Sequence, residues 1–305
     1  MSATTKLDGK VAVVTGAGRG LGRAYAVALA AAGAAVVVND VEADAAESAV
    51  KEITDAGGEA VAEIGAVGPS DTADQLVARA VEAFGRLDTM VTNAGILRDT
   101  VLWKMTDEQF DAVIETHLRG TFTCARAAAI RFREQGEGGS LILIGSPSGQ
   151  FGNFGQSNYG PAKAGIVTMA RVWSMELARA NVTVNAVVPT AWTEMTATIP
   201  IYEPLIEKAQ KGEPFPAQVR QAHALGPASD CAALVVFLAS DAAREVTGQA
   251  IGIGGDKLTM YAHPSEAAVA FFEGGWTPEA IADNWSSTMG PHAQTSGMTL
   301  PPLDI

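Results

Sequence analysis

The stretch Val-Ala-Val-Val-Thr-Gly-Ala-Gly-Arg-Gly-Leu-Gly at residues 11–22 decides the fold class of this chain. Its first five residues predict a buried β-strand, and the alanine-rich run at 21–32 predicts a helix. Glycines between a strand and a helix permit a tight turn, and they let backbone amides approach a pyrophosphate at the positive helix end. Glycine-rich turns also occur without a ligand, but this strand-turn-helix context favours dinucleotide binding.

The same alternation of short apolar runs and longer helical patterns continues along the chain. Strands are predicted at residues 11–15, 35–39, 60–64, 89–92, 140–144, 183–187 and 250–253, and helices at 21–32, 43–56, 72–84, 107–133, 161–178 and 229–239. This pattern is typical of an α/β fold. We therefore expect a single Rossmann-type, doubly wound parallel sheet of about seven strands, with helices on both faces.

The predicted domain organisation follows from where the alternation of strands and helices stops. Residues 1–256 form the expected nucleotide-binding domain, and the proline-rich stretch 190–216 interrupts it as a surface excursion. Residues 257–305 form a C-terminal extension with a helix at 278–284 capped by Thr277. Its tryptophans, Trp276 and Trp285, suggest docking on the body or on a partner subunit.

Bulk composition excludes several classes of protein. The hydrophobic fraction of 48% and charged fraction of 18% are typical of a soluble globular enzyme, and the net charge of −13 argues against nucleic-acid binding. Two cysteines, Cys124 and Cys231, indicate a reducing compartment without a disulfide framework. No secretion signal, membrane span, metal-site motif or peroxisomal targeting signal is recognised, so we expect a cytoplasmic protein without a metal.

Asp40 lies at the end of the second predicted strand, eighteen residues after Gly22. A carboxylate there is suited to bind both ribose hydroxyls of NAD and would repel the 2′-phosphate of NADP. Arg19 in the glycine turn is able to serve such a phosphate, but close contact between two anions is hard to offset, so NAD is favoured. Asp40 is also placed to cap the helix that follows.

Three further residues form a candidate reaction centre. Tyr159 and Lys163 are four apart and share one face of a predicted helix, so the lysine ammonium is placed to lower the pKa of the phenol. Ser146 follows the apolar run 141–144, where a strand end would aim its hydroxyl at the same place. On its own, the Tyr-x-x-x-Lys spacing is more typical of an ordinary amphipathic helix surface than of a reaction centre.

Taken together, these motifs resemble the short-chain dehydrogenase/reductase family. The resemblance rests on the glycine turn at 15–22, Asn-Ala-Gly at 93–95, Ser146, and Tyr-x-x-x-Lys at 159–163, in the family's order and spacing. Four further stretches (37–40, 93–99, 117–120 and 152–156) are similar to the (3R)-hydroxyacyl-CoA dehydrogenase branch found in peroxisomal multifunctional enzymes, also described as 17β-hydroxysteroid dehydrogenases. Apart from this likeness, Asn-Ala-Gly reads equally well as a simple turn.

The resemblance implies roles for individual residues. Tyr159 is implied as the general acid/base, Lys163 as the residue that lowers its pKa and binds the nicotinamide ribose, and Ser146 as the group that orients the substrate oxygen. Cofactor contacts are implied for Gly16, Arg19, Gly20, Leu21, Gly22, Asp40, Val67, Asn93, Ala94, Gly95, Tyr159, Lys163, Pro189, Thr190 and Thr193.

The chain departs from the wider family at three positions. His117 stands where most members have an asparagine that supports a water relay to the lysine; the branch shares this histidine, so it is expected to take that catalytic role. Ala66-Val67 replaces Asp-Val, which leaves only the backbone amide of Val67 to meet the adenine. Pro189-Thr190 replaces Pro-Gly, which leaves open whether Thr190 or Thr193 holds the carboxamide.

The function implied is NAD-dependent interconversion of a secondary alcohol and a ketone, with a (3R)-hydroxyacyl-CoA as the leading substrate. The alternatives are a hydroxysteroid, 3-oxoacyl-carrier-protein reduction, or a non-catalytic NAD-binding protein. Residues 190–216 are expected to form a substrate lid whose apolar residues either face the substrate or pack the lid down; they are Ile199, Ile201, Tyr202, Leu205 and Phe215. Family members assemble through helices, so a homodimer or homotetramer is expected.

Overall fold

The computed structural model describes residues 4–192, 205, 213–298 and 301. Of the predicted site residues, Thr193 lies outside these residues, as do Ile199, Ile201 and Tyr202 of the predicted lid.

An eight-stranded sheet, in the order β3-β2-β1-β4-β5-β6-β7-β8, forms the centre of the fold. All neighbouring strands are parallel except the last pair, β7 and β8. The order reverses between β1 and β4, which is the switch point where doubly wound folds bind nucleotides. The strands are β1 (Val11–Val14), β2 (Ala35–Asp40), β3 (Glu59–Ile64), β4 (Thr89–Thr92), β5 (Gly139–Ile144), β6 (Val182–Pro189), β7 (Ala250–Gly254) and β8 (Lys257–Tyr261). The predicted fold class is confirmed.

Strand β8 adds an eighth strand to the predicted sheet of about seven, and it lies in the first residues of the stretch predicted as the C-terminal extension. It pairs antiparallel with β7 across a two-residue turn, where Gly255 adopts a left-handed φ of 49°. Leu258 and Met260 remain 68% and 60% exposed, so this edge strand lacks the buried apolar run that marks the inner strands of the sheet. Sequence periodicity therefore missed it.

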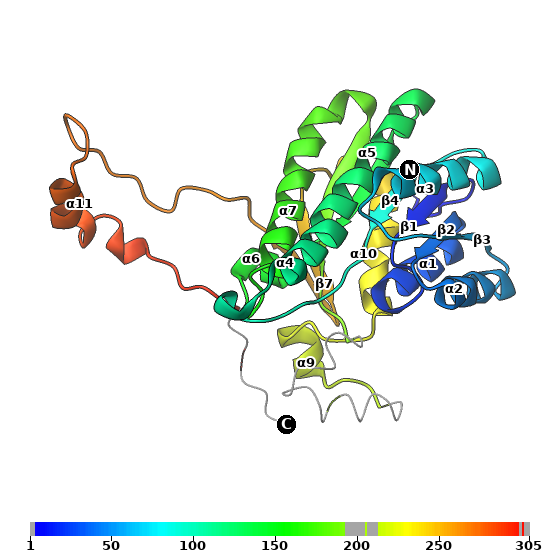
Figure 1. Ribbon diagram of the computed structural model, residues 1–305, viewed down its shortest axis with the longest axis horizontal. Helices are drawn as coiled ribbons and strands as arrows, with labels where there is room; N and C mark the ends of the chain where they lie inside the picture. The colour runs from blue at the N-terminus through cyan, green and yellow to red at the C-terminus, as the bar shows by residue number, and fades with distance from the viewer. Residues whose placement is uncertain (1–3, 193–204, 206–212, 299–300, 302–305) are drawn as a thin grey trace.

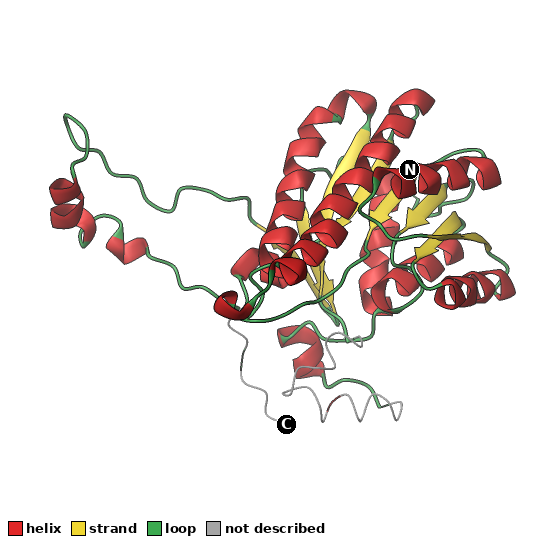
Figure 2. Cartoon of the chain, viewed as in Figure 1, coloured by secondary structure: helices red, strands yellow, loops and turns green. Residues whose placement is uncertain are grey.

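Helices cover both faces of the sheet (Figures 1 and 2). One buried cluster joins residues of α1, α2 and α10 to the sheet, and a second joins residues of α3, α5 and α7 to its other face. The helices are α1 (Gly20–Ala31), α2 (Ala43–Asp55), α3 (Ser70–Phe84), α4 (Asp107–Val113), α5 (Gly120–Gln135), α6 (Pro147–Phe151), α7 (Tyr159–Glu176), α9 (Ala217–Ala222), α10 (Ser229–Ala239) and α11 (Pro278–Trp285). No helix among the described residues is long and apolar enough to cross a membrane.

A π-helical turn, η2 (Ile114–Arg119), interrupts the helix predicted at 107–133. The single predicted helix is therefore α4, η2 and α5 in succession. A π turn inserts one residue into the helical repeat, and such turns are frequent at functional sites. Here the turn carries His117, which is 2% exposed.

The C-terminal extension leaves the body after β8 and carries α11 away from the sheet (Figure 1). Thr277 caps α11 by accepting from the amide of Ala280 (3.1 Å), as predicted. The chain then returns to the body, where the amide of Gly297 donates to the carbonyl of Phe151 (2.8 Å).

Candidate active site

The carboxyl ends of the strands bring most of the predicted residues to one edge of the sheet. The glycine turn follows β1, Asp40 ends β2, Asn93 follows β4, Ser146 follows β5, and Pro189 ends β6. Parallel strands place all these ends on the same side, where α/β proteins bind their ligands.

Close packing requires the glycines of the first turn. Gly16 has a left-handed φ of 61°, and a Cβ on Gly22 would lie 2.1 Å from the carbonyl oxygen of Gly16. The side-chain amide of Asn93 donates to the carbonyl oxygens of Thr15 and Gly16, each at 3.0 Å. In this structure Asn93 therefore stabilises the glycine turn through two of its backbone carbonyls.

Asp40 faces the same turn. Its Oδ2 accepts from the amide of Gly18 (2.9 Å), and its Oδ1 accepts from the amide of Glu42 (3.2 Å). Glu42, not Asp40, is the N-cap residue of α2, so the capping role considered for Asp40 is wrong. Arg19 is exposed and provides no side-chain cap to α1, whose first amides point toward this region.

The remaining predicted cofactor residues line the rest of this edge. Val67 is buried against α5, where a Cβ on Gly120 would approach its Cγ2 to 2.8 Å. Thr190 donates its amide to the carbonyl of Ile253 (2.9 Å), which ties the end of β6 to β7. Ala94 packs against Gly16, where an added Cβ would lie 2.7 Å from its Cα.

Ser146, Tyr159 and Lys163 meet at the ends of β5 and α7. Lys163 is 3% exposed and donates its ammonium to the carbonyl oxygen of Ile144 (2.7 Å), while its Nζ lies 5.6 Å from the centre of the Tyr159 ring. Ser146 caps α6 by accepting from the amide of Ser148 (3.2 Å), which leaves its hydroxyl proton free to donate. The expected constellation is therefore brought together.

The protonation balance of this group differs from the prediction. Burial raises the pKa of Tyr159, a hydrogen bond with Ser146 opposes this rise, and the charge of Asp99 adds to it. Burial also lowers the pKa of Lys163 to about 7. The net shift of the phenol pKa is thus upward, opposite to the expected depression by Lys163, because burial outweighs the hydrogen bond with Ser146.

His117 lies directly against this group. Its ring is edge-on to that of Tyr159, with centroids 5.1 Å apart, and its Nε2 lies 3.0 Å from the amide nitrogen and 2.8 Å from the carbonyl oxygen of Ile96. Burial first, and then the charge of Lys163, lower the pKa of His117 to about 3, so the ring is neutral at pH 7. Nδ1 is buried and has no hydrogen-bond partner among the described residues. Gly95 makes room for the ring, since a Cβ there would lie 2.3 Å from Cε1.

Sequence analysis missed three residues around Tyr159. Asp99 couples to the phenol, Gln156 donates to Asp99, and Asn158 holds the first turn of α7. Two side-chain amides within three residues of the tyrosine were the available signal, but polar residues before a helix usually indicate only a cap.

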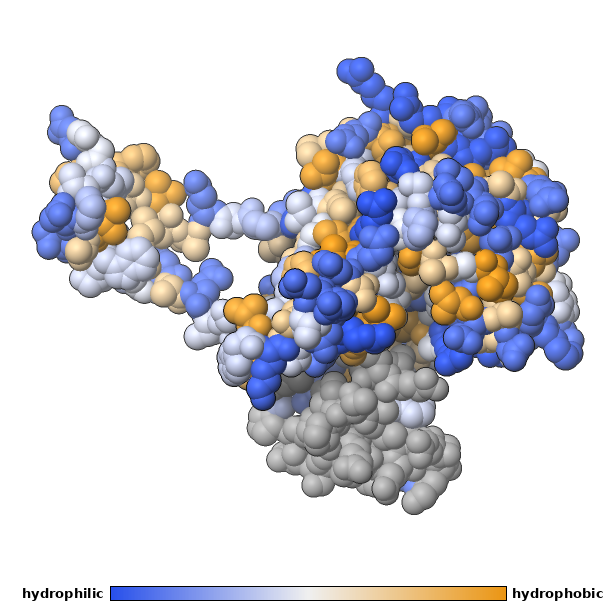
Figure 3. Space-filling view, in the orientation of Figure 1, coloured by the Kyte–Doolittle hydropathy of each residue, from blue (hydrophilic) through white to orange (hydrophobic). Residues whose placement is uncertain are grey.

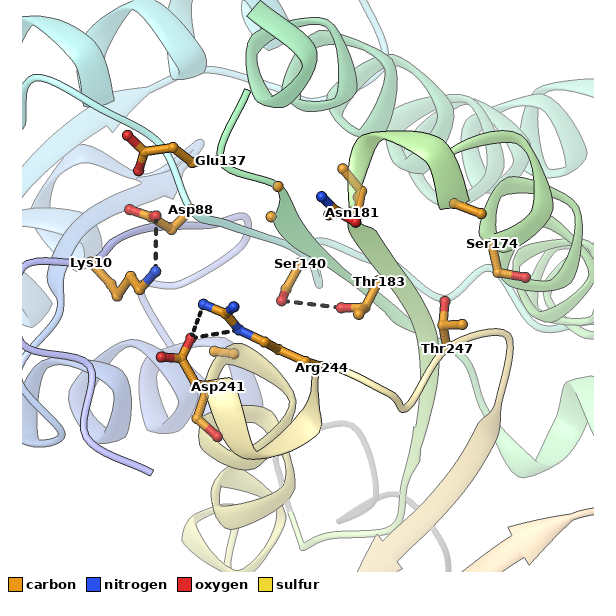
Figure 4. A pocket seen from close by; sticks show the side chains of 16 residues that line it. Lys10, Asp88, Glu137, Ser140, Ser174, Asn181, Thr183, Asp241, Arg244 and Thr247 are labelled. Atoms are coloured by element: carbon orange, nitrogen blue, oxygen red, sulfur yellow. Dashed lines mark hydrogen bonds and ion pairs between the residues drawn. The ribbon is translucent and has the colours of Figure 1, made fainter. Parts of the chain in front are cut away.

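A separate cavity of ≈ 430 Å³ lies at the opposite, amino-terminal edge of the sheet (Figure 4). Its charged residues are all paired: Lys10 lies 3.6 Å from Asp88, Arg244 lies 2.9 Å from Asp241, and Glu137 lies 2.7 Å from Arg86, outside the lining. None of its lining side chains appears among the buried polar atoms without partners in the described part of the chain. It therefore offers no comparable set of reactive groups.

The residues at the carboxyl edge fit a dinucleotide. A Cβ on Gly18 would lie 2.8 Å from Oδ2 of Asp40, so the carboxylate packs closely against the glycine turn that forms the cradle. Such a cradle beside an uncapped helix start suits a pyrophosphate, and the neighbouring carboxylate suits ribose hydroxyls.

Comparison with known proteins agrees with this geometry. The family model for short chain dehydrogenases matches residues 10–201. The hydroxyacyl-CoA dehydrogenase ChsB1 of Mycobacterium tuberculosis is 44% identical over 273 residues, covering 86% of this chain and 82% of that protein. Peroxisomal multifunctional enzyme type 2 of Mus musculus is 37% identical over 295 residues, covering 93% of this chain but 37% of that enzyme.

Among solved structures, a short chain dehydrogenase from Mycobacterium avium is similar with a TM-score of 0.82 and 38% identity, covering 95% of this chain and 97% of that one. The chain therefore belongs to the short-chain dehydrogenase/reductase family of NAD(H)- or NADP(H)-dependent oxidoreductases.

Proposed function

We propose that this protein is an NAD-dependent oxidoreductase that interconverts a (3R)-hydroxyacyl-CoA and its 3-oxoacyl-CoA. The meeting of Ser146, Tyr159 and Lys163 beside the dinucleotide cradle is the observation that carries the chemistry. The substrate class is supported by the 44% identity to a hydroxyacyl-CoA dehydrogenase over most of both chains.

Proton transfer is assigned to Tyr159. Its phenolate accepts the proton of the substrate hydroxyl, and Ser146 donates a hydrogen bond to the oxygen that becomes the carbonyl. Bound NAD would supply the acceptor for the hydride that leaves the same carbon, and the positive charge of its oxidised ring would favour the phenolate. Lys163 holds its position through Ile144 and retains two ammonium hydrogens for the ribose and for water.

His117 is proposed to stand in for the family's asparagine. Its Nδ1 is buried near Lys163 without a partner among the described residues, and it donates or accepts according to the tautomer, so it suits a bridging water that passes the proton outward. This role requires a neutral imidazole ring, and a pKa of about 3 keeps the ring of His117 neutral at pH 7.

Asp40 supports NAD as the cofactor. Its carboxylate stands where the adenosine ribose would lie, held by the amide of Gly18, and an anion there disfavours a 2′-phosphate.

The substrate lid remains a proposal for residues 190–216. Of its predicted apolar residues, Leu205 and Phe215 are buried at 2% and 8% exposure in a small cluster with Val219 and Leu225. This supports the alternative in which these two side chains pack the lid down.

Replacement of Tyr159 by Phe tests the assignment. We expect NAD affinity close to wild type, because the hydroxyl is aimed at the substrate, and a fall in kcat of at least about 100-fold, as for other general acid/base groups. Stopped-flow and steady-state rates with (3R)-hydroxyacyl-CoA, with binding of NAD measured by calorimetry, provide the readouts. Appreciable turnover by the variant would contradict the role of Tyr159.

The substrate class is tested on the wild-type chain. Rates with (3R)- and (3S)-hydroxyacyl-CoA, a 17β-hydroxysteroid and a 3-oxoacyl carrier protein, each with the NAD and NADP forms, separate the alternatives. The largest kcat/KM is expected for the (3R)-hydroxyacyl-CoA with NAD. NAD binding without turnover of any of these compounds would favour a non-catalytic protein.

A further inference from the structure

Asn158, directly before Tyr159, joins three parts of the site through one side chain. It is fully buried, and its Oδ1 accepts from the amide of Tyr159 at 2.7 Å. Both hydrogens of its Nδ2 are used, in bonds of 3.1 Å to the carbonyl oxygens of Arg98 and Gln109. The first turn of α7 is thereby tied to the loop after β4 and to α4.

The residues beside Asn158 extend this connection. Gln156 donates from Nε2 to Oδ2 of Asp99 (2.8 Å), and the amide of Thr100 donates to the carbonyl of Gly155 (2.8 Å). Residues 98, 99 and 100 are therefore each held by the segment 155–158. We call residues 96–101 the β4 loop.

The β4 loop contributes two neighbours to the environment of the phenol, one through a charge and one through a ring contact. Asp99 acts on Tyr159 through its charge, and Ile96 contacts His117, which packs edge-on against the tyrosine ring. Among the described residues, the other polar groups beside Tyr159 are Ser146 and Lys163, and neither lies on this loop. A shift of the loop would therefore move one charge and one ring relative to Tyr159 while leaving the other two groups in place.

We propose that Asn158 is a positioning residue: its amide holds the β4 loop at a fixed distance from α7, and so sets how far the carboxylate of Asp99 lies from the phenol of Tyr159. The inference rests on the proposed function only for its rate readout. In this scheme Asn158 touches neither substrate nor cofactor and acts through the loop.

Replacement of Asn158 by Ser separates helix capping from positioning. Serine caps a helix about as well as asparagine, but it cannot reach the carbonyls of Arg98 and Gln109. We expect kcat to fall about 10- to 100-fold, as for a displacement near 1 Å, with NAD affinity unchanged. Amide hydrogen exchange in the β4 loop should become faster.

The pH profile supplies a readout that a purely structural role would not move. Because the charge of Asp99 raises the pKa of Tyr159, a loosened loop lowers that pKa, and the acid limb of the oxidation rate moves to lower pH. Asp99→Asn should shift the limb in the same direction. The double variant, Asn158→Ser with Asp99→Asn, should shift it no further than Asp99→Asn alone, since both changes remove one interaction.

Asn185→Ala is the matched control. Asn185 is also buried, and it also bridges backbone groups, donating to Val246 (2.7 Å) and accepting from Gln249 (3.1 Å), but away from the phenol. It should lose thermal stability without moving the acid limb. If Asn158→Ser behaves like Asn185→Ala, or if the shifts of Asn158→Ser and Asp99→Asn add, the positioning role is overturned.

Hydrogen exchange keeps the two proposals distinguishable. A wild-type chain that turns over none of the tested alcohols would overturn the proposed function, whereas exchange in the β4 loop would still report on Asn158. Unchanged exchange in Asn158→Ser would overturn the positioning role even in an active enzyme.

Discussion

Burial determines the protonation states of the candidate catalytic side chains. Lys163 and His117 are both almost inaccessible, and desolvation is the leading cause of the lowered pKa of each. A cation in such a place is unfavourable to folding. The chain therefore retains Lys163 at a cost in stability at neutral pH, whereas His117 carries such a cost only in acid, below its unfolded pKa of 6.5.

Lys163→Met should reveal this cost. The folded pKa of about 7 lies below the unfolded value of 10.5, so the unfolded state binds more protons between these values, and the penalty is full below pH 7 and gone by about pH 10.5. We expect the variant to have the higher Tm at pH 6, by a few degrees, and the advantage to disappear as pH approaches about 10.5. Thermal scans of both proteins across this range provide the measurement; a constant difference in Tm would contradict it.

Asp40→Ser should change cofactor preference. Removing the carboxylate removes the repulsion of a 2′-phosphate, and we expect the ratio of kcat/KM for NADP over NAD to rise at least about tenfold, or ~1.4 kcal/mol. Glu42→Gln is the control, because it removes a nearby exposed carboxylate and leaves the bond between Gly18 and Asp40 in place. Equal effects of the two changes would point to general charge rather than to Asp40.

At the scale of elements, the π turn η2 packs closely against the residues that follow β4. The turn carries His117, whose ring packs against Gly95. Asn158 links the β4 loop to α7. A helix of regular pitch through 114–119 would present a different side of the chain to β4. The reaction centre therefore depends on contacts between elements far apart in sequence.

Gly95→Ala should disturb this fit. The added Cβ would lie 2.3 Å from Cε1 of His117, so the ring or the strand end must move, at an expected cost of about 1–3 kcal/mol in unfolding free energy. Urea unfolding and kcat measure the effect. Gly160→Ala is the control for stability, because its Cβ would meet only Ser148 at an ordinary 3.5 Å. If Gly95→Ala changed neither the unfolding free energy nor kcat, the ring of His117 would have room to move aside.

At the scale of the whole molecule, the C-terminal extension exposes large apolar side chains that do not pack on the body of the protein. Phe271 is 92% exposed and Trp285 53% exposed, on an arm that stands clear of the sheet between its two anchored ends (Figure 1). In the face shown in Figure 3, apolar residues gather on this arm as well as on the body. Exposed aromatics of this kind are typical of protein interfaces.

We expect the arm to pack on a second copy of the chain, in keeping with the expected homodimer or homotetramer. Phe271→Ser with Trp285→Ser should then lower the mass measured by light scattering at micromolar concentration, with little change in secondary structure. Ile64→Ser, which removes an apolar side chain 42% exposed on β3, is the control. An unchanged mass in the arm variant would leave the arm without this role.

The fold class and the principal site residues were predictable from local chemistry. A glycine turn between a strand and a helix, a carboxylate at the next strand end, and Tyr159 four residues before Lys163 are short-range patterns, and parallel strands bring their ends together without further information. Strand β8, the π turn and the β4 loop were not predictable in this way. They depend on pairing at an exposed edge, on the ring of His117 against Gly95, and on one amide that joins Asn158 to Arg98. The protonation balance at Tyr159 likewise follows from desolvation, which exists only once the chain has packed around it.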